Sequence, residues 1–565
     1  MVYILIYSLF YCLFKRMQSV VKWSQGLKLH GVNIGNSHRR NFVHPTTRPW
    51  CIASSKSHQI TKPDQTCPDS LPIFNQSANA PLVEALKIAA TEQVACFHFP
   101  GHNRGKAAPT SLSSLIGSGP FNNDLPELPE LDDLFSPQGP ILEAQSLASE
   151  LFGAQNTWFL VNGTTCGIHA AIMATCNPGD ILILPRNSHL SATSGMVLTG
   201  ARPKYIMPDY NPNWDVAGGV SVLEVQRAIQ EVERDGSKVG AVLVTTPTYH
   251  GICSNLEDIV KICHSLDIPV IADEAHGAHF RFNKAFPRSA LEQGADLSVQ
   301  STHKVLSSLT QSSMLHLSGN LVDPEQVSRC LQLLQSSSPS YLLLSSLDAA
   351  RAQLGDNMGI FDQSLGLALE ARKKIQEIPG IDLLDLSVFG LNFCDIDPLR
   401  ITVGTSHLGL SGHVADDILY ECYRIVPELV GTWFLTFAFN LGTHHMDVER
   451  LILGLKHLSD NFFHENSKIL CGERDGSIQP FEKSQMKLTP RDAFFAKKRR
   501  VSIKDSIGEI CGELICTYPP GIPLLIPGEV ITEDALTYLL NAQKQGAMVS
   551  GASDTSLCSV IVCAQ

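Results

Sequence analysis

Residues 269–276 read PVIADEAH, and residues 297–304 read LSVQSTHK. Each stretch opens with a short apolar run, which is typical of a buried strand, and continues into polar residues. Asp273 follows the first run directly, and Lys304 follows the second after Ser301-Thr-His. Because open α/β sheets bind ligands beyond the carboxyl ends of their strands, we expect this carboxylate and this amine at one ligand-binding edge.

The same alternation of apolar runs with helical patterns extends through the middle of the chain. Strands that alternate with helices predict a largely parallel sheet covered on both faces, and therefore an α/β fold class. We expect helices at 140–151, 164–175 and 366–376, and strands at 157–161, 181–184, 204–207, 241–244, 269–272 and 297–300.

Composition and patterning divide the chain into five expected segments. Hydrophobic residues make up 44% of the chain and charged residues 17%, which is typical of a globular protein and predicts a core of ample size. The expected segments are a leader at 1–75, a major domain at 76–385, a small α+β domain at 386–465, a linker at 466–489 and a C-terminal module at 490–565.

A third chemical group lies upstream, where Asn162-Gly-Thr-Thr165 turns an expected strand into a helix. Free backbone N–H groups and hydroxyls at a helix start form an anion site that suits a phosphate. Pyridoxal phosphate needs such a site, together with a lysine for its aldehyde and a carboxylate for its ring nitrogen. The order of the three groups at strand ends, more than any one of them, predicts a site for this cofactor.

Other functions fit the sequence less well. A net charge of −12 at pH 7 argues against nucleic acid as a partner, since phosphates attract basic proteins. Asp273-Glu-Ala-His276 matches a helicase box, but no G-x-x-x-x-G-K-[ST] loop accompanies it. We expect no metal site, because His279 begins an alternating, strand-like segment and does not form a ligand pair with His276.

Motifs along most of the chain resemble those of one family, the bacterial-type ornithine/lysine/arginine decarboxylases of the aspartate-aminotransferase fold (fold type I). The resemblance covers roughly residues 80–565. It implies a large domain that binds pyridoxal phosphate, followed by smaller α+β units. The motifs are Pro100-Gly-His102, Glu127 to Leu134, Arg186-Asn-Ser-His189, Pro247-Thr-Tyr249, Ser301-Thr-His-Lys304 with Leu309-Thr-Gln311, Leu408 to Gly412, and Tyr518 to Pro523 with Pro527-Gly-Glu529.

The resemblance implies a role for each matching residue at the cofactor ring. Lys304 would hold the cofactor covalently, and Asp273 would pair with the ring nitrogen and keep it protonated. Ala275, with His276 beside it, would lie against one face of the ring. His189 would stack on the other face.

The resemblance also assigns the phosphate and the substrate. Thr164, Thr165 and Ser301 would bind the phosphate, and His303 would lie beside the lysine and help return a proton to the substrate. Three further residues are assigned to the substrate: Glu529 would approach its distal cation, His102 would reach the site of a partner subunit, and His250 stands where relatives often carry Tyr or Asp, a departure that bears on specificity for the distal group.

The implied reaction is decarboxylation of a basic amino acid to an amine of polyamine metabolism. The sequence leaves arginine, lysine and ornithine open as substrates. One alternative is another fold-type-I enzyme, such as an acyl-CoA-condensing synthase or an aminotransferase. A second alternative is a catalytically silent homologue that acts as a scaffold or regulator, although such a protein would need neither Lys304 nor Asp273.

The first 63 residues contain nine basic residues and no acidic residue. A basic, hydroxyl-rich leader predicts an organelle transit peptide, with the plastid favoured over the mitochondrion and the cytosol. Either Met1 or Met17 is the start of this leader. The apolar run at 2–14 is shorter than the roughly 20 residues of a spanning helix, so we expect no membrane anchor. The fold implied by the resemblance also predicts a homodimer.

Overall fold

The computed structural model describes residues 79–357, 359–389, 393–464, 485–518 and 521–564. These residues belong to one compact unit. The predicted leader and most of the predicted linker lie outside the described residues. Within the described ranges, every helix is too short or too polar to cross a bilayer.

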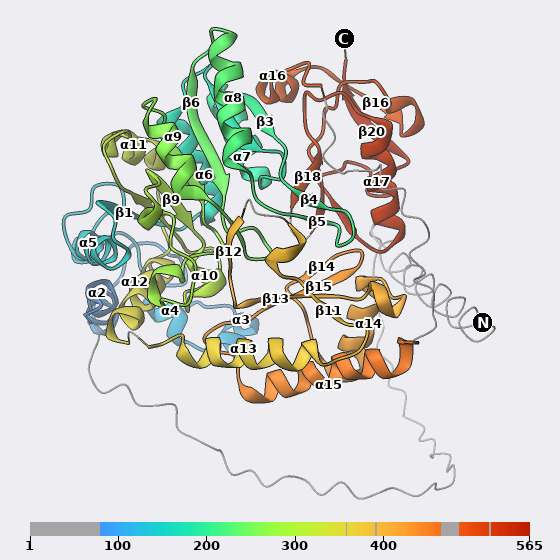
Figure 1. The fold of residues 1–565 in the computed structure, drawn as a ribbon. Coiled ribbons are helices and arrows are strands. Elements are labelled where there is room, and N and C mark those ends of the chain that lie inside the picture. The colour runs from blue at the N-terminus through green and yellow to red at the C-terminus, as the bar shows by residue number, and fades with distance from the viewer. Residues whose placement is uncertain (1–78, 358, 390–392, 465–484, 519–520, 565) are drawn as a thin grey trace, which may run out of the picture. The chain divides into compact units, whose positions relative to one another are not determined.

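A seven-stranded sheet forms the centre of the major domain (Figure 1). Its order is β1-β10-β9-β8-β6-β2-β3. Neighbouring strands from β9 to β3 pair in parallel, and β10 runs in the opposite direction, antiparallel to both β1 and β9. The predicted α/β class with a mainly parallel sheet is therefore confirmed. The bounds are β1 (Asn156–Leu160), β2 (Ile181–Pro185), β3 (Arg202–Ile206), β6 (Val239–Thr245), β8 (Val270–Asp273), β9 (Leu297–Gln300) and β10 (Ser313–Leu317).

Helices cover both faces of the sheet because its strands bury side chains on both sides. In β2, Leu182 and Leu184 pack against one group of helices, whereas Ile181 and Ile183 pack against the other. Successive side chains of a strand point to opposite faces, which explains this division. The first group is α6 (Gly163–Thr175), α7 (Leu190–Thr199) and α11 (Pro324–Leu334), and the second is α8 (Val222–Arg234) and α9 (Leu256–His264).

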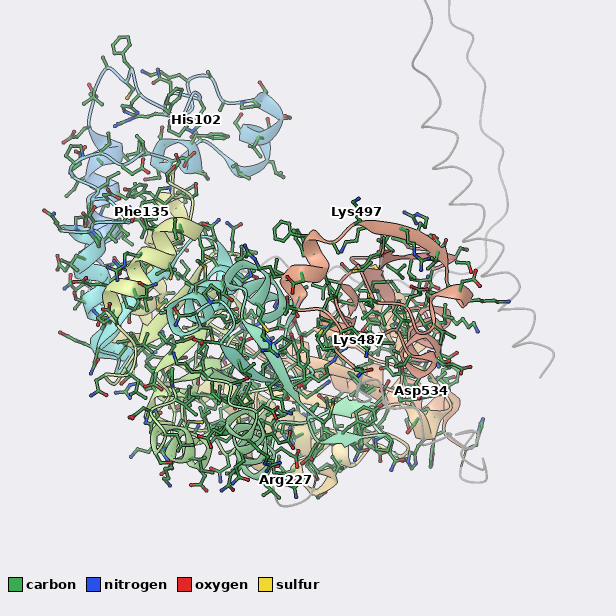
Figure 2. All side chains as sticks on the ribbon, turned by 90° about the horizontal axis from the view of Figure 1, so that it is seen from above. His102, Phe135, Arg227, Lys487, Lys497 and Asp534 are labelled. Atoms are coloured by element: carbon green, nitrogen blue, oxygen red, sulfur yellow. The ribbon has the colours of Figure 1, made fainter. Side chains whose placement is uncertain are left out.

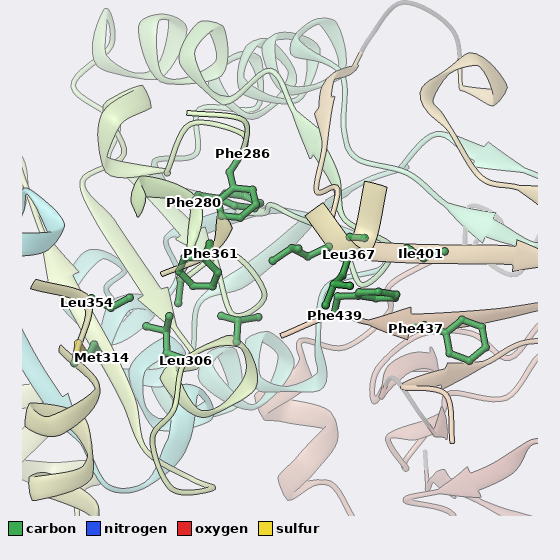
Figure 3. Close-up of a cluster of buried hydrophobic side chains, with 14 of the residues drawn as sticks. Phe280, Phe286, Leu306, Met314, Leu354, Phe361, Leu367, Ile401, Phe437 and Phe439 are labelled. Atoms are coloured by element: carbon green, nitrogen blue, oxygen red, sulfur yellow. The ribbon is translucent and has the colours of Figure 1, made fainter. Parts of the chain in front are cut away.

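The small domain shares its core with the major domain. Phe280 and Phe286 of the major domain and Ile401 and Phe437 of the small domain belong to one cluster of buried hydrophobic side chains (Figure 3). Strand β7 (Ile252–Ser254) also pairs with β12 (Phe393–Ile396). The small domain comprises α13 (Asp362–Gln376), α14 (Gly412–Tyr423), α15 (His445–Phe462) and a sheet of order β11-β13-β15-β14: β11 (Asp382–Leu383), β13 (Arg400–Gly404), β15 (Phe434–Ala438) and β14 (Leu429–Val430). Both α13 and β11 lie before the boundary expected at 385, and β11 pairs with β13, so the small domain begins earlier than the sequence indicated.

An N-terminal arm, residues 92–124, extends from the helices beside the sheet. Asp348 accepts a hydrogen bond of 2.9 Å from the backbone N–H of Leu82 and so fixes the start of α2. Beyond α2 the chain runs out through the arm, and Figure 2 shows the segment around His102 standing away from the other elements. The helices concerned are α2 (Pro81–Thr91), α3 (Thr110–Ile116), α4 (Gly119–Asn123), α5 (Pro140–Phe152) and α12 (Tyr341–Asp356).

The C-terminal module has a hydrophobic core of its own, which includes Leu536, Leu539 and Val562. Its strands form two small sheets, β16-β20 and β18-β17-β19. The bounds are α16 (Pro490–Phe495), β16 (Lys498–Ser502), β17 (Ile515–Tyr518), β18 (Ile522–Leu525), α17 (Glu533–Lys544), β19 (Met548–Ser550) and β20 (Ser559–Cys563). A short hairpin of the major domain, β4 (Tyr210–Asn211) and β5 (Val216–Ala217), completes the strands.

Two local features differ from the sequence-based expectation. Strand β10 was not predicted, because buried Ser313 and His316 interrupt its apolar residues. The strand expected from His279 onward is wrong, since a 3₁₀ turn follows at Phe280–Phe282. Nε2 of the fully buried His279 lies 3.2 Å from Oδ1 of Asp397, and its ring packs against Phe280 and Phe286. The alternating apolar residues that suggested a strand therefore reflect burial in the core shared by the two domains.

Candidate active site

A cavity of about 500 Å³ opens at the carboxyl edge of the central sheet. The ends of β6 and β8, the segment after β9 and the start of α6 all contribute to its wall. The structure brings nine of the twelve sequence-predicted site residues to this one place. They are Thr164, Thr165, His189, Asp273, Ala275, His276, Ser301, His303 and Lys304.

Lys304 lies in α10 (Thr302–Val305), a single turn that follows β9 directly. Its Nζ atom is 3.1 Å from Nε2 of His276. Burial lowers the pKa of Lys304, Arg400 lowers it further, and Asp273 partly opposes the shift. A lowered pKa raises the fraction of free amine, whose lone pair can attack a carbonyl carbon.

Asp273 is the last residue of β8, and only 5% of it is exposed. Its Oδ1 atom accepts a hydrogen bond of 3.3 Å from the backbone N–H of Ala275. Burial raises the pKa of this carboxyl, while Lys304 and that N–H act in the opposite direction. A cation placed in the cavity would favour the carboxylate, because an opposite charge nearby stabilises the ionised form.

The start of α6 forms an anion cradle beside these two groups. Gly163 begins the helix with a φ of +76°, a conformation that side chains disfavour, and so lets the chain turn sharply into it. The hydroxyl of Thr164 lies 2.5 Å from that of Ser301 and 2.9 Å from that of Ser313. Hydroxyls and free helix N–H groups of this kind bind phosphate.

Two histidines of the cavity are held as neutral imidazoles. His189 caps α7 by accepting a hydrogen bond of 3.2 Å at Nδ1 from the N–H of Ser191, and burial lowers the pKa of His189 to about 4. His303 lies with Nδ1 2.7 Å from the carbonyl of Ser312, and burial lowers its pKa as well. Because a carbonyl only accepts, His303 carries its proton on Nδ1 and leaves Nε2 as an acceptor.

Two of the residues assigned to the substrate lie elsewhere in this chain. His102 belongs to the arm, where Nε2 is 3.1 Å from Asp124 and the ring meets Phe121 edge-to-face. His250 lines a neighbouring cavity, and its Nδ1 is 3.1 Å from the hydroxyl of Thr436. Burial lowers the pKa of His250 to about 3, so it contributes no charge near neutral pH.

Glu529 is the third residue outside the cavity. Its carboxylate accepts hydrogen bonds from Nη2 of Arg186 at 2.8 Å and from Nε at 3.1 Å. Both side chains are almost fully buried. In this arrangement the carboxylate joins the C-terminal module to the major domain, and its predicted contact with substrate stays a prediction.

The sequence-based reasoning missed three residues that belong to the site. Thr245 lines the cavity at the end of β6, in register with Asp273, one residue beyond the strand predicted at 241–244. Glu428 also lines the cavity, and Arg400 lies behind it, with Nη2 3.2 Å from Nδ1 of His276. Both come from the small domain, and no local pattern signals their approach to the sheet.

The residues present fit pyridoxal phosphate. The cavity offers an amine, a buried carboxylate and an anion cradle, which are the three groups that this cofactor needs. The hydroxyl of Thr245 is buried in the cavity wall and, within the described residues, has no hydrogen-bond partner. Buried hydroxyls are normally bonded, so this one is consistent with a ligand that supplies the missing partner.

Comparisons with known proteins agree with this geometry. Residues 80–447 match the family model "Orn/Lys/Arg decarboxylase, major domain", and residues 479–554 match the model of its C-terminal domain. An arginine decarboxylase of Halalkalibacterium halodurans is 37% identical over 85% of this chain and 97% of its own length. An arginine decarboxylase of Bacillus subtilis is 36% identical over 84% and 96%, respectively.

A solved structure shows the same fold. The constitutive lysine decarboxylase of E. coli superposes with a TM-score of 0.75 over 86% of this chain and 82% of its own chain, at 22% sequence identity. The family model of the major domain alone matches more than half of the sequence. The chain therefore belongs to the Orn/Lys/Arg decarboxylase family.

Proposed function

We propose that this chain is a pyridoxal-phosphate-dependent lyase that converts a basic amino acid into the corresponding amine and CO₂. The observation that carries the proposal is the single cavity that holds Lys304, Asp273 and the anion cradle of α6 together. Arginine is the first substrate to test, because relatives at 36–37% identity are named arginine decarboxylases. Lysine and ornithine are the alternatives.

Each group of the cavity has a distinct task in this reaction. When bound, pyridoxal phosphate accepts the electrons that CO₂ leaves behind. Lys304 is the amine that attaches the cofactor, and Asp273 stabilises positive charge at the ring nitrogen. The hydroxyls of Thr164 and Ser301 hold the phosphate and so fix the orientation of the ring.

The two neutral histidines have different tasks: His303 transfers a proton, and His189 packs against the ring of the cofactor. His303 keeps Nδ1–H on the carbonyl of Ser312, and its Nε2 is therefore able to relay a proton. Together with Lys304 it is the candidate donor of the proton that replaces CO₂ on the substrate carbon. His189, with its Nδ1 bonded to Ser191, presents a fixed ring for stacking.

Decarboxylation is better supported than the alternative activities. An acyl-CoA-condensing synthase or an aminotransferase leaves the C-terminal module unexplained, whereas residues 479–554 match a domain model of the decarboxylase family. A silent scaffold would not need to keep both Lys304 and Asp273 at one cavity. The amine product would enter polyamine metabolism.

The decisive experiment is release of labelled CO₂ by the purified full chain with added pyridoxal phosphate. Carboxyl-labelled arginine, lysine and ornithine are compared at equal concentration, and we expect turnover of at least one, with arginine fastest. Covalent cofactor binding is measured in parallel. Cofactor attached to the protein without CO₂ release from any of the three would contradict a decarboxylase.

The arm points to a homodimer. Three large apolar side chains of the arm are exposed to solvent: Phe97 is 99% exposed, Phe99 84% and Leu115 79%. Exposed apolar patches of this kind mark protein interfaces. A second copy of the chain is the partner that we propose, with the arm of each copy reaching the site of the other.

The leader supports an organelle location. Its nine basic and zero acidic residues before Asp64 are the observation behind a plastid address. A fluorescent reporter fused to residues 1–75 or 17–75 should enter plastids, and the shorter fusion tests Met17 as the start. Diffuse cytosolic signal from both fusions would exclude this address.

A further inference from the structure

Two consecutive nitrogen–nitrogen contacts connect Arg400 of the small domain to Lys304. Arg400 Nη2 lies 3.2 Å from Nδ1 of His276, and Nε2 of the same ring lies 3.1 Å from Nζ of Lys304. Arg400 and His276 are 3% and 5% exposed, respectively. Water therefore has little access to the contact between Arg400 and His276, which must satisfy one another, whereas Lys304 borders the open cavity.

The chemistry of the three side chains fixes which nitrogen donates and which accepts in these two contacts. A guanidinium has five N–H donors and no acceptor, so Nδ1 of His276 must accept from Arg400. A neutral imidazole carries one proton, which is then on Nε2 and points at Lys304. Only an amine with a free lone pair can accept that hydrogen bond.

Any other protonation state of Lys304 or His276 would place two N–H donors opposite each other with no acceptor between them. If Lys304 were an ammonium, it would donate to Nε2 and force the proton of the ring onto Nδ1, facing Arg400. If His276 were an imidazolium, both of its N–H groups would face donors. Burial, together with Lys304 and Arg400, lowers the pKa of His276 well below its usual value, in agreement with a neutral ring.

We propose that Arg400 is a positioning residue that locks His276 in the Nε2–H tautomer, so that His276 donates to Lys304 and holds it as a neutral amine nucleophile. This inference rests on the proposed function, in which Lys304 attaches the cofactor. It adds a role for two residues, one from each domain.

The backbone around Arg400 is built to hold this position. Arg400 is the first residue of β13, and its N–H donates to the carbonyl of Asp397 at 3.1 Å. Gly251 has a φ of +86° and lies so close that an added Cβ would be 3.0 Å from Cβ of Arg400 and 2.9 Å from Cβ of Asp397. A glycine is needed there, because it lets the two domains approach closely enough for the guanidinium to reach His276.

Other charged groups also act on Lys304. Asp273 and Glu428 favour the ammonium form of Lys304, and Arg400 disfavours it. His189 and His303 are the other ionisable groups near the lysine. Arg400 thus has two separable effects on the lysine, its positive charge and the N–H that selects the tautomer. The experiment must distinguish them.

Three variants at one position make this separation. Arg400→Gln keeps an N–H donor but removes the charge, Arg400→Leu removes both, and Arg400→Lys keeps both on a shorter side chain. The readout is the pKa of Lys304 in the full chain freed of cofactor, obtained from the pH dependence of acetic anhydride labelling with peptides quantified by mass spectrometry. Other lysine peptides of the same digest are internal standards.

We expect Arg400→Leu to raise the pKa of Lys304 by about one unit or more, with its labelling at pH 7.5 slowed several-fold. Arg400→Gln should give a clearly smaller rise. In a His276→Phe background the Leu and Gln variants should become equal, because only the loss of charge remains. Equal shifts in the wild-type background, or no shift at all, would show that the tautomer is not controlled by Arg400.

A measurement on the unmutated chain keeps the inference testable if the buried variants fail to fold. With ¹⁵N-labelled histidine, His276 should show a pyridine-type shift at Nδ1 and a pyrrole-type shift at Nε2, assigned by their loss in His276→Phe. The reversed pattern overturns the proposal. Covalent cofactor binding and CO₂ release by the wild type test the proposed function separately, whatever the tautomer.

Discussion

The guanidinium of Arg186 and the carboxylate of Glu529 form a two-pronged ion pair across 343 residues of sequence. Their side chains are 3% and 5% exposed, respectively. Arg186 also donates to the backbone carbonyls of Pro523 and Leu524, at 2.7 and 3.1 Å. The C-terminal module is therefore fixed to the end of β2, three residues before His189 of the active site.

Glu529→Gln should destabilise the protein by about 3–5 kcal/mol, because it leaves a buried guanidinium without its countercharge. Urea unfolding of the purified chain measures the loss. The double variant Arg186→Met, Glu529→Leu is the matched control and should be closer to wild type, since it removes both charges. If Glu529→Gln instead changes the preference between arginine and lysine at unchanged stability, Glu529 has the substrate role that the resemblance implies.

Lys304→Ala should abolish covalent cofactor attachment and almost all turnover, because among the described residues Lys304 is the one amine that lines the cavity beside Asp273 and the anion cradle. Borohydride reduction followed by peptide mapping should find a pyridoxyl group on Lys304 of the wild type and on no peptide of the variant. Labelling of a different lysine in the wild type would contradict this assignment.

Asp273→Asn should lower kcat by roughly 10³-fold or more, the size of effect expected when a preorganised charge is lost from a buried site. An amide cannot balance the positive charge of the ring nitrogen, although it keeps the shape of the carboxylate. KM should change much less than kcat. Near-normal kcat in this variant would mean that another group supports the cofactor.

The residues that could be predicted from the sequence are those that follow their own strands directly. Asp273, Lys304 and Thr164 each come just after an apolar run, and parallel strands bring such positions to one edge. The motifs of the family then assigned roles to neighbours such as His189. This part of the site depends only on local pattern and on the direction of the strands.

The remaining site residues depend on contacts that no local pattern encodes. Glu428 reaches the cavity, and Arg400 reaches His276 behind it, because the small domain packs on the sheet through the shared core. The partner of Glu529 likewise depends on how the C-terminal module docks on the major domain. Thr245 was missed for a smaller reason, since the strand continues one residue further than its apolar run.

Buried His316 should make the stability of the protein depend on acid pH. Its ring lies between Thr157 and Gln300, at 2.8 and 3.2 Å, and burial lowers its pKa to about 3. The unfolded chain takes up the proton near pH 6.5, whereas the folded chain does so only near pH 3. The contribution of His316 is therefore present above pH 6.5 and is lost as the pH falls between these values, by roughly 1 kcal/mol per pH unit.

Unfolding free energies measured from pH 7 to pH 4.5 test this dependence. His316→Gln removes the titrating group and should give a flatter profile than the wild type. Phe152→Leu is the control, because it alters the ring that stacks on His316 and should lower stability equally at every pH. Parallel profiles for the wild type and His316→Gln would show that this histidine does not couple folding to protons.

The arm provides a test of shared active sites. If His102 serves the cavity of the partner, a chain with Lys304→Ala and a chain with His102→Ala are each inactive alone but complement each other. In a mixed dimer one site combines the intact lysine of one chain with the intact arm of the other, as two-fold symmetry requires.

Random pairing makes about half of the dimers mixed, and each mixed dimer restores one of its two sites, so recovery should be at most about a quarter of wild-type activity. Two controls are needed: His102→Ala must be inactive by itself, and exchange of subunits must be confirmed with distinguishable tags. The exposed Phe97 and Phe99 give a parallel test, since replacing both with Ser should weaken the dimer in light scattering. With exchange confirmed, absence of recovered activity would mean that each chain completes its site alone and that the arm has a different partner.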